Sequence, residues 1–182
     1  MLEIKVPDTE LWDYSKEVFV SVAGQTLQLE HTLVTLSEWE SKWKVPFLSE
    51  TKKSADEILD YVKIMTITPN VPEELYYALT SEHYDAINNY ISDPMTATWF
   101  NKLPEKGRNR QEQVTSELIY YRMIALNIPI DVCQHWHLNR LLTLIEVCNR
   151  KNQPPKKMSK SEALRQTAAM NAKRRAQLKS KG

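Results

Sequence analysis

The chain of 182 residues contains three glycines, Gly24, Gly107 and Gly182. All-β folds place glycine at many of their tight turns, so this scarcity disfavours them. The glycine-rich loops that bind nucleotide phosphates are also absent, because neither GxGxxG nor the P-loop motif occurs in the sequence. We therefore predict a mostly α fold, a small helical domain.

Residues 1–35 depart from the helical pattern. Glu17–Ala23 and Thr26–Leu33 alternate apolar and polar residues and are rich in β-branched side chains. This alternation predicts an N-terminal β-hairpin that turns at Gly24-Gln25. A third strand at Leu2–Val6 could join it.

Two capping boxes predict the first helix starts, at Ser37 and at Ser54. In each, the serine oxygen accepts the N3 amide and a glutamate three residues later reaches back to the cap. The first helix should end before Pro46, because the residue that precedes a proline avoids the helical conformation. The second helix should run to about Thr66. Its predicted inner stripe consists of Ile58, Leu59, Val62 and Met65.

Two long helices are predicted to form the centre of the core. The first covers residues 110–127 and the second residues 130–149, and Pro129 separates them. Pro72 is expected at the first position of a third helix, and Ser81 is expected to cap a fourth. The predicted inner stripe of the first long helix consists of Val114, Leu118, Tyr121 and Ala125.

Charge is distributed unevenly along the chain. Residues 151–182 hold ten Lys and Arg and one acidic residue, which gives +9, whereas residues 1–150 carry −8. After Pro154-Pro155 the sequence is rich in good helix formers. We therefore divide the chain into an acidic, mainly helical body at 1–151 and a basic linker and tail helix at 152–182.

The basic tail is the predicted partner-binding region. A basic helix with a narrow apolar face attracts acidic or helical partners over long range but binds them with low affinity. Nucleic acid is an alternative partner for the same charges, although the acidic body would repel phosphate. The face of the body that carries Trp39 and Trp43 is an alternative binding site. The tail residues predicted to bind are Lys156, Lys157, Lys160, Arg165, Lys173, Arg174 and Arg175.

Cys133, His135, His137 and Cys148 suggest a zinc site, but helical geometry argues against it. On one continuous helix only Cys133 and His137 share a face, and Cys148 lies about 16 Å further along the axis. At most two ligands converge, whereas a structural zinc site needs four. We expect Cys133, His137 and Cys148 to pack in the core and His135 to point elsewhere. We predict no catalytic residue, no metal, no cofactor and no enzymatic activity.

The sequence favours a cytosolic location. Two cysteines in a chain of this length fit a reducing compartment better than a disulfide framework. The N-terminal stretch MLEIKVPDTE lacks the basic-then-apolar pattern of a signal peptide. No apolar run approaches the ~18 residues that a membrane-spanning helix needs.

Four stretches of the sequence resemble a family of proteins from long-tailed bacteriophages, the tail assembly chaperones encoded near the tape-measure gene. None of the four is a catalytic signature. Together they cover roughly half of the chain, and they are Leu29–Ser49 (LEHTLVTLSEWESKWKVPFLS), Asp93–Phe100 (DPMTATWF), Ile119–Pro129 (IYYRMIALNIP) and Trp136–Ser159 (WHLNRLLTLIEVCNRKNQPPKKMS).

This resemblance implies a chaperone that coats the long, helical, aggregation-prone tape-measure protein in the host cell cytoplasm. Major tail subunits then polymerise around the coated protein, and the chaperone does not enter the finished virion. The implied partners are the tape-measure protein, with the major tail protein and a second copy of the chain as further candidates, and no membrane. Two alternatives stay open, a virion structural or head–tail joining protein and a small phage protein that binds nucleic acid through its basic tail.

Overall fold

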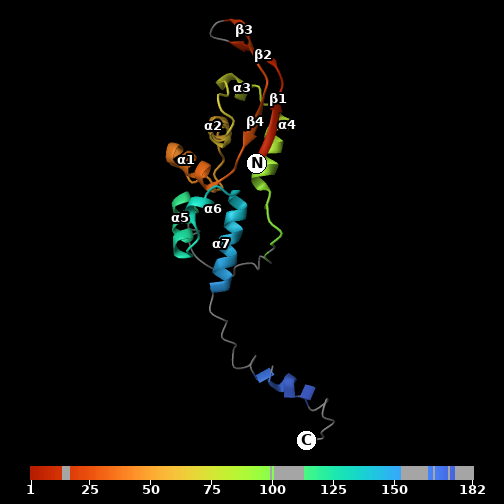
Figure 1. Cartoon of the computed structure of the whole chain (residues 1–182), viewed down its shortest axis with the longest axis vertical. Coiled ribbons are helices and arrows are strands. Elements are labelled where there is room, and N and C mark those ends of the chain that lie inside the picture. The colour runs from red at the N-terminus through yellow and green to blue at the C-terminus, as the bar shows by residue number, and fades with distance from the viewer. Residues whose placement is uncertain are drawn as a thin grey trace. The chain divides into compact units, whose positions relative to one another are not determined.

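The computed structural model describes residues 1–13, 17–98, 100 and 113–152, together with helical residues 164–165, 167–171 and 173–174 (Figure 1). The chain divides into two compact units, Met1–Asn149 and Arg150–Gly182. The named elements, in chain order, are β1 (Leu2–Val6), β2 (Thr9–Asp13), β3 (Val18–Val22), β4 (Gln25–Leu29), α1 (Leu33–Trp43), α2 (Ala55–Met65), α3 (Glu73–Tyr77), α4 (Ser81–Ser92), α5 (Ser116–Ala125), α6 (Ile130–Cys133) and α7 (Leu138–Asn152). The predicted division between residues 151 and 152 therefore falls at the last residue of α7.

The N-terminal strands form two antiparallel pairs, β1 with β4 and β2 with β3. Both pairs keep one register, since Val6 lies opposite Gln25 and Thr9 opposite Val22. The two pairs are thus successive parts of one long hairpin. Its ladder is interrupted once, between Val6 and Thr9 on one arm and between Val22 and Gln25 on the other. The predicted pairing of the third strand with the fourth is wrong, although the predicted strand at Leu2–Val6 is present.

Gly24 lies at the interruption of this hairpin and not in its turn. Its N–H donates to Asp8 Oδ1 at 2.6 Å. A Cβ at this position would lie 2.5 Å from backbone atoms of Val6, Pro7 and Asp8, so only glycine allows this approach. Pro7 has no N–H to donate to a ladder, which explains why pairing stops here.

The buried apolar side chains of the described residues form two clusters, and α1 contributes to both. In the first, Ile4 and Leu27 of the β1–β4 pair pack with Trp39 of α1 and with residues of α2, α3 and α4. In the second, Leu36 of α1 packs with Ile119 of α5 and with residues of α6 and α7. Helix α1 therefore joins the two halves of the body.

The prediction of a mostly α fold is wrong. The first cluster contains a complete β layer, whose buried residues are Ile4, Val6, Val22, Leu27 and Leu29. Helix α4 lies beside β1, so the strands form one wall of that core (Figure 1). The body is a mixed α and β structure in which the strands supply core surface. Within the described residues, helices also occur in the regions after residue 36 where they were expected, although several of their bounds differ.

The predicted helix start at Ser54 is confirmed. Ser54 caps α2, with the Glu57 amide bonded to its hydroxyl and its own N–H bonded to the Glu57 carboxylate. The prediction at Ser37 is wrong, because α1 begins at Leu33 and Thr32 is its cap. This helix ends at Trp43, before Pro46, as predicted.

The expected starts at Pro72 and Ser81 are displaced by one residue. Pro72 is the cap of α3, and Thr80 is the cap of α4. The Thr80 N–H bonds to the ring of His83, which takes the place that glutamate has in other capping boxes. Both short helices therefore exist near their predicted positions.

The predicted inner stripe of the first long helix is wrong. Helix α5 begins at Ser116 and buries Ser116, Ile119 and Met123, whereas Tyr121 is 65% exposed and Ala125 is also exposed. Residues 110–112, where the helix was expected to start, lie outside the described residues.

The second long helix is interrupted between Cys133 and Leu138, which gives α6 and α7. The segment between them forms backbone hydrogen bonds with the residues around the start of α1. The Leu33 N–H donates to the Gln134 carbonyl at 3.2 Å, and the Leu138 N–H donates to the His31 carbonyl at 2.9 Å. These long-range bonds replace the helical bonds that a continuous helix would make.

Glu40 shows why Ser37 does not cap a helix. The Glu40 side chain is buried, and its two oxygens accept the Phe47 N–H at 2.8 Å and the Ser116 N–H at 2.7 Å. The carboxylate thereby fixes the loop after α1 and occupies the N-terminus of α5, where the helix dipole favours a negative charge. Glu40 thus connects two segments that lie 76 residues apart in the chain.

Glu40→Gln should lower the free energy of unfolding by about 1–3 kcal/mol. The amide retains one oxygen, so its NH₂ group must face either the Phe47 N–H or the Ser116 N–H, and both are donors. Urea denaturation measures the change. Glu38→Gln is the control, because Glu38 is exposed on the same helix and its substitution should change stability by less than about 0.5 kcal/mol. Equal stability of the two variants would contradict this role of Glu40.

Candidate functional site

The tail residues predicted to bind a partner are exposed where the structure describes them. Arg165, Lys173 and Arg174 lie on helical residues and face solvent. The apolar tail residues Leu164 and Met170 are also exposed, at 70% and 52%. The other predicted tail residues, Lys156, Lys157, Lys160 and Arg175, lie outside the described residues.

Trp39 and Trp43, the alternative site, belong to the packing between α1 and α2. Trp39 is fully buried, and its indole N–H donates to the Glu57 carbonyl at 2.9 Å. Trp43 is half-buried, and its N–H donates to Asp60 Oδ2 at 2.8 Å. Asp60 also forms an ion pair with Lys42. Of the two tryptophans, only Trp43 has surface with which to touch a partner.

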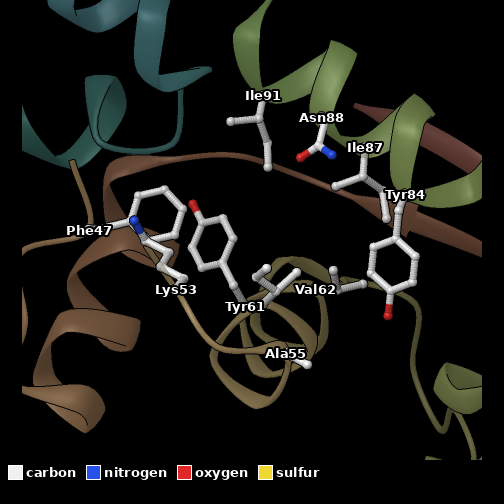
Figure 2. Close-up of a pocket in the computed structure, with 10 residues that line it drawn as sticks. Phe47, Lys53, Ala55, Tyr61, Val62, Tyr84, Ile87, Asn88 and Ile91 are labelled. Carbon is white, nitrogen blue, oxygen red and sulfur yellow. The ribbon is translucent and has the colours of Figure 1, made fainter. Parts of the chain in front are cut away.

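Sequence reasoning did not predict a groove that lies between α2 and α4. It has a volume of about 570 Å³. Val62 of α2 and Ile87 of α4 form its floor and are almost fully buried, whereas Ile58 on its rim is 43% exposed. Figure 2 shows Phe47 and Lys53 at one end of the groove and Tyr84 at the other.

On each of the two helices, the residues that line the groove have the spacing of a single helical face. The α2 residues Ala55, Ile58 and Val62 are spaced i, i+3 and i+7, and Tyr84, Ile87 and Ile91 of α4 have the same spacing. This stripe on α4 was the sequence signal for the groove. Sequence alone assigned Ile58 to the core, because an apolar stripe does not reveal whether a further layer covers it.

Lys53 is the cation of the groove. Its ammonium nitrogen lies 4.7 Å from the centre of the Phe47 ring and 5.8 Å from that of Trp39. Burial lowers the pKa of Lys53, and nearby Glu57 opposes this shift. Among residues 1–13, 17–98 and 113–152, no carboxylate oxygen lies within 4.0 Å of this nitrogen. The groove is therefore apolar with one positive end.

Tyr61, which lines the groove, contacts one member of a histidine pair in which His31 is buried and His137 is half-buried. The Tyr61 hydroxyl lies 2.6 Å from His31 Nδ1, and burial raises the Tyr61 pKa. The rings of His31 and His137 are 5.3 Å apart. Burial lowers the pKa of His31 to about 4, with the charge of His137 as the second cause, and burial also lowers the pKa of His137. Both rings are therefore neutral near pH 7.

The hydrogen bonds of His137 fix its tautomer. The Asn139 N–H donates to Nδ1 at 3.3 Å, so Nδ1 is an acceptor. Nε2 then carries the proton and donates to the Tyr90 carbonyl at 3.0 Å. This arrangement stabilises the neutral ring, because a proton on Nδ1 would point at the Asn139 N–H, which is also a donor.

Cys133, His137 and Cys148 do not share one helix face, because α6 ends at Cys133 and α7 begins at Leu138. Cys133 is buried, and burial raises the pKa of its thiol. Cys148 is half-buried on α7. Within the described parts of the chain, no three His, Cys, Asp or Glu side chains are grouped so that they could hold a metal ion.

In the same parts of the chain, no helix has the length and apolar character needed to cross a membrane. No protein-family model matches the sequence, and neither the curated proteins nor the solved structures contain a match to it. The groove and the basic tail are thus the two surfaces from which a function can be argued.

Proposed function

We propose that this chain is a tail assembly chaperone of a long-tailed bacteriophage, which binds the tape-measure protein in the host cytoplasm and does not enter the finished virion. The four stretches that resemble this family support the proposal. The observation that carries it is the exposure of Arg165, Lys173 and Arg174 on a helical segment of the tail. Cations that face solvent are available to the acidic side chains of a helical partner.

Charge makes this binding fast and reversible. The +9 of residues 151–182 attracts an acidic partner over a distance of about 8 Å at physiological ionic strength. Exposed ion pairs add little to affinity once formed, typically less than about 1 kcal/mol each. A chaperone needs this combination, because the tail tube must displace it from the tape-measure protein during assembly.

Reversing three tail charges should reduce binding to the tape-measure protein. For the triple variant Lys173→Glu, Arg174→Glu and Arg175→Glu, we expect the association rate to fall roughly tenfold or more, with a smaller change in dissociation. Co-expression with the tape-measure protein of the same genome should show the parallel loss of soluble tape-measure protein. The control is Lys173→Arg, Arg174→Lys and Arg175→Lys, which keeps the charge and should behave as the intact chain does.

Deletion of residues 156–182 separates the tail from the body. Both buried clusters lie within residues 1–149, so the free energy of unfolding should change by less than about 0.5 kcal/mol while tape-measure binding is lost. If the shortened chain keeps the tape-measure protein as soluble as the intact chain does, the body carries the function. If the intact chain has no effect on that solubility, the chaperone proposal is wrong.

Two further measurements separate the alternatives. Mass spectrometry of purified particles should not detect the chain, whereas a head–tail joining protein would be present. A titration with double-stranded DNA should show no binding at physiological salt beyond the weak, salt-sensitive attraction of any basic segment. Tight, sequence-dependent DNA binding would favour the nucleic-acid alternative.

A further inference from the structure

Helix α5 carries an apolar stripe on the side away from its core. Tyr121 and Ile124 are 65% and 62% exposed, although both belong to a helix that buries Ile119 and Met123 on its opposite side. A helix that is apolar on two sides is normally covered on both. Glu117, which is exposed one turn before Tyr121, adds a carboxylate to the same stripe.

The groove between α2 and α4 matches this stripe in length. The three residues of the α5 stripe are spaced i, i+4 and i+7, and the stripes on both walls of the groove also extend over seven residues. At 1.5 Å per residue each stripe is about 10 Å long. A helix can pack against two others at interaxial distances of 8–10 Å, and the exposed Ile58 on the rim would then be covered.

The charges of the two surfaces are also complementary. Lys53 makes one end of the groove positive, and the nearby Glu57 carboxylate already accepts the Ser54 N–H. Glu117 lies at one end of the α5 stripe. With the Glu117 carboxylate at Lys53, Tyr121 and Ile124 extend along the apolar floor.

We propose that the groove between α2 and α4 binds helix α5 of a second copy of this chain, with Glu117 of one copy facing Lys53 of the other. The two surfaces cannot meet within one copy, because Ile119 and Met123 hold α5 in the second buried cluster while the groove belongs to the first. Because the two surfaces differ, a pair joined by one such contact keeps a free α5 stripe on one copy and a free groove on the other for further neighbours. Such contacts build rings or filaments. This inference does not depend on the proposed partner of the tail.

A single-helix interface is small, so the association should be weak. Small interfaces typically give dissociation constants of about 1 µM to 1 mM. Sedimentation velocity of the full chain over this concentration range should show a mean mass that rises with concentration. A chain that stays monomeric at about 1 mM overturns the proposal.

Two charge-reversing substitutions test whether Lys53 of one copy faces Glu117 of the other. Lys53→Glu and Glu117→Lys should each reduce association at least tenfold when the variant is studied alone. An equimolar mixture of the two should associate again, because the reversed groove of one attracts the reversed helix of the other. Recovery in the mixture also shows that both variants are folded. Association that is unchanged in the single variants, or that stays lost in the mixture, contradicts the proposed pairing.

The apolar part of the contact has a matched control. Ile124→Ser should abolish association, whereas Val132→Ser should leave it unchanged, because Val132 is similarly exposed at 56% but lies on α6 outside the stripe. Equal effects of the two substitutions would mean that general surface apolarity drives association. If the tape-measure protein, and not a second copy, shifts the NMR signals of Ile58 and Ile91, the occupant of the groove is that partner and the proposal is wrong.

Discussion

Trp39→Ala should lower the free energy of unfolding by about 3–5 kcal/mol, the range found for buried aromatic side chains. Trp39 is fully buried at the centre of the first cluster. The Phe47 ring lies 5.1 Å from it edge-on, and the Tyr61 ring lies 6.4 Å away. Truncation would leave a cavity between α1 and α2 and would leave the Glu57 carbonyl without its side-chain donor.

Trp43→Ala is the matched control on the same helix. Trp43 is half-buried, so its truncation removes less apolar contact, together with one hydrogen bond to Asp60. We therefore expect the free energy of unfolding to fall by roughly 1–2 kcal/mol. Urea denaturation followed by far-UV circular dichroism compares the two. If Trp39→Ala were as stable as the intact chain but failed to bind a partner, Trp39 would be an accessible anchor, and the packing described for α1 would be incorrect.

Local signals in this sequence predicted local structure well. The capping box at Ser54 involves residues only three apart, and α2 begins where it indicates. The same signature at Ser37 failed because Glu40 bonds to the N–H groups of Phe47 and Ser116. A capping glutamate can be assigned only when no distant donor competes for it, and sequence does not show such a donor.

Gly24 shows a second limit of sequence reasoning. Glycine between two β-like segments indicates a tight turn, but it also occurs where two backbones approach closely. Here the second reason holds, since Gly24 contacts the Pro7–Asp8 backbone across the hairpin. The strands were therefore predicted in the right places with the wrong partners. The N-terminal hairpin was predicted, but the contribution of its strands to the first buried cluster was not.

The helix stripes explain why the groove and the α5 surface were not predicted. A stripe of apolar residues identifies a helix face but not what covers it. Tyr121 was assigned to the core because α5 is apolar on both sides, and the side that packs is decided by α1 and α7. The break between α6 and α7 arises in the same way, from bonds to residues about a hundred positions earlier in the chain.

Acidification should destabilise the fold through His31. Its pKa is about 4 in the folded chain, compared with 6.5 for a free histidine. Above pH 6.5 the His31 ring is neutral in both the folded and the unfolded chain, so its titration does not lower the free energy of unfolding. Between pH 6.5 and 4 the unfolded chain binds a proton that the folded chain does not, so stability falls with pH. The difference corresponds to roughly 3 kcal/mol lost by pH 4. The lowered pKa of His137 acts in the same direction.

His31→Gln isolates this effect. Glutamine can keep a hydrogen bond to the Tyr61 hydroxyl but does not titrate, so the variant should be less stable at pH 7 and should vary less with pH between 6.5 and 5. Glu73 and Glu117 contribute little in this window, because their lowered pKa values make their stabilisation disappear only below about pH 4.5. Urea denaturation at half-unit pH steps gives both profiles. Identical slopes for the two chains would place the titrating group elsewhere, since a buried histidine that stays neutral must produce a slope of up to about 1.4 kcal/mol per pH unit.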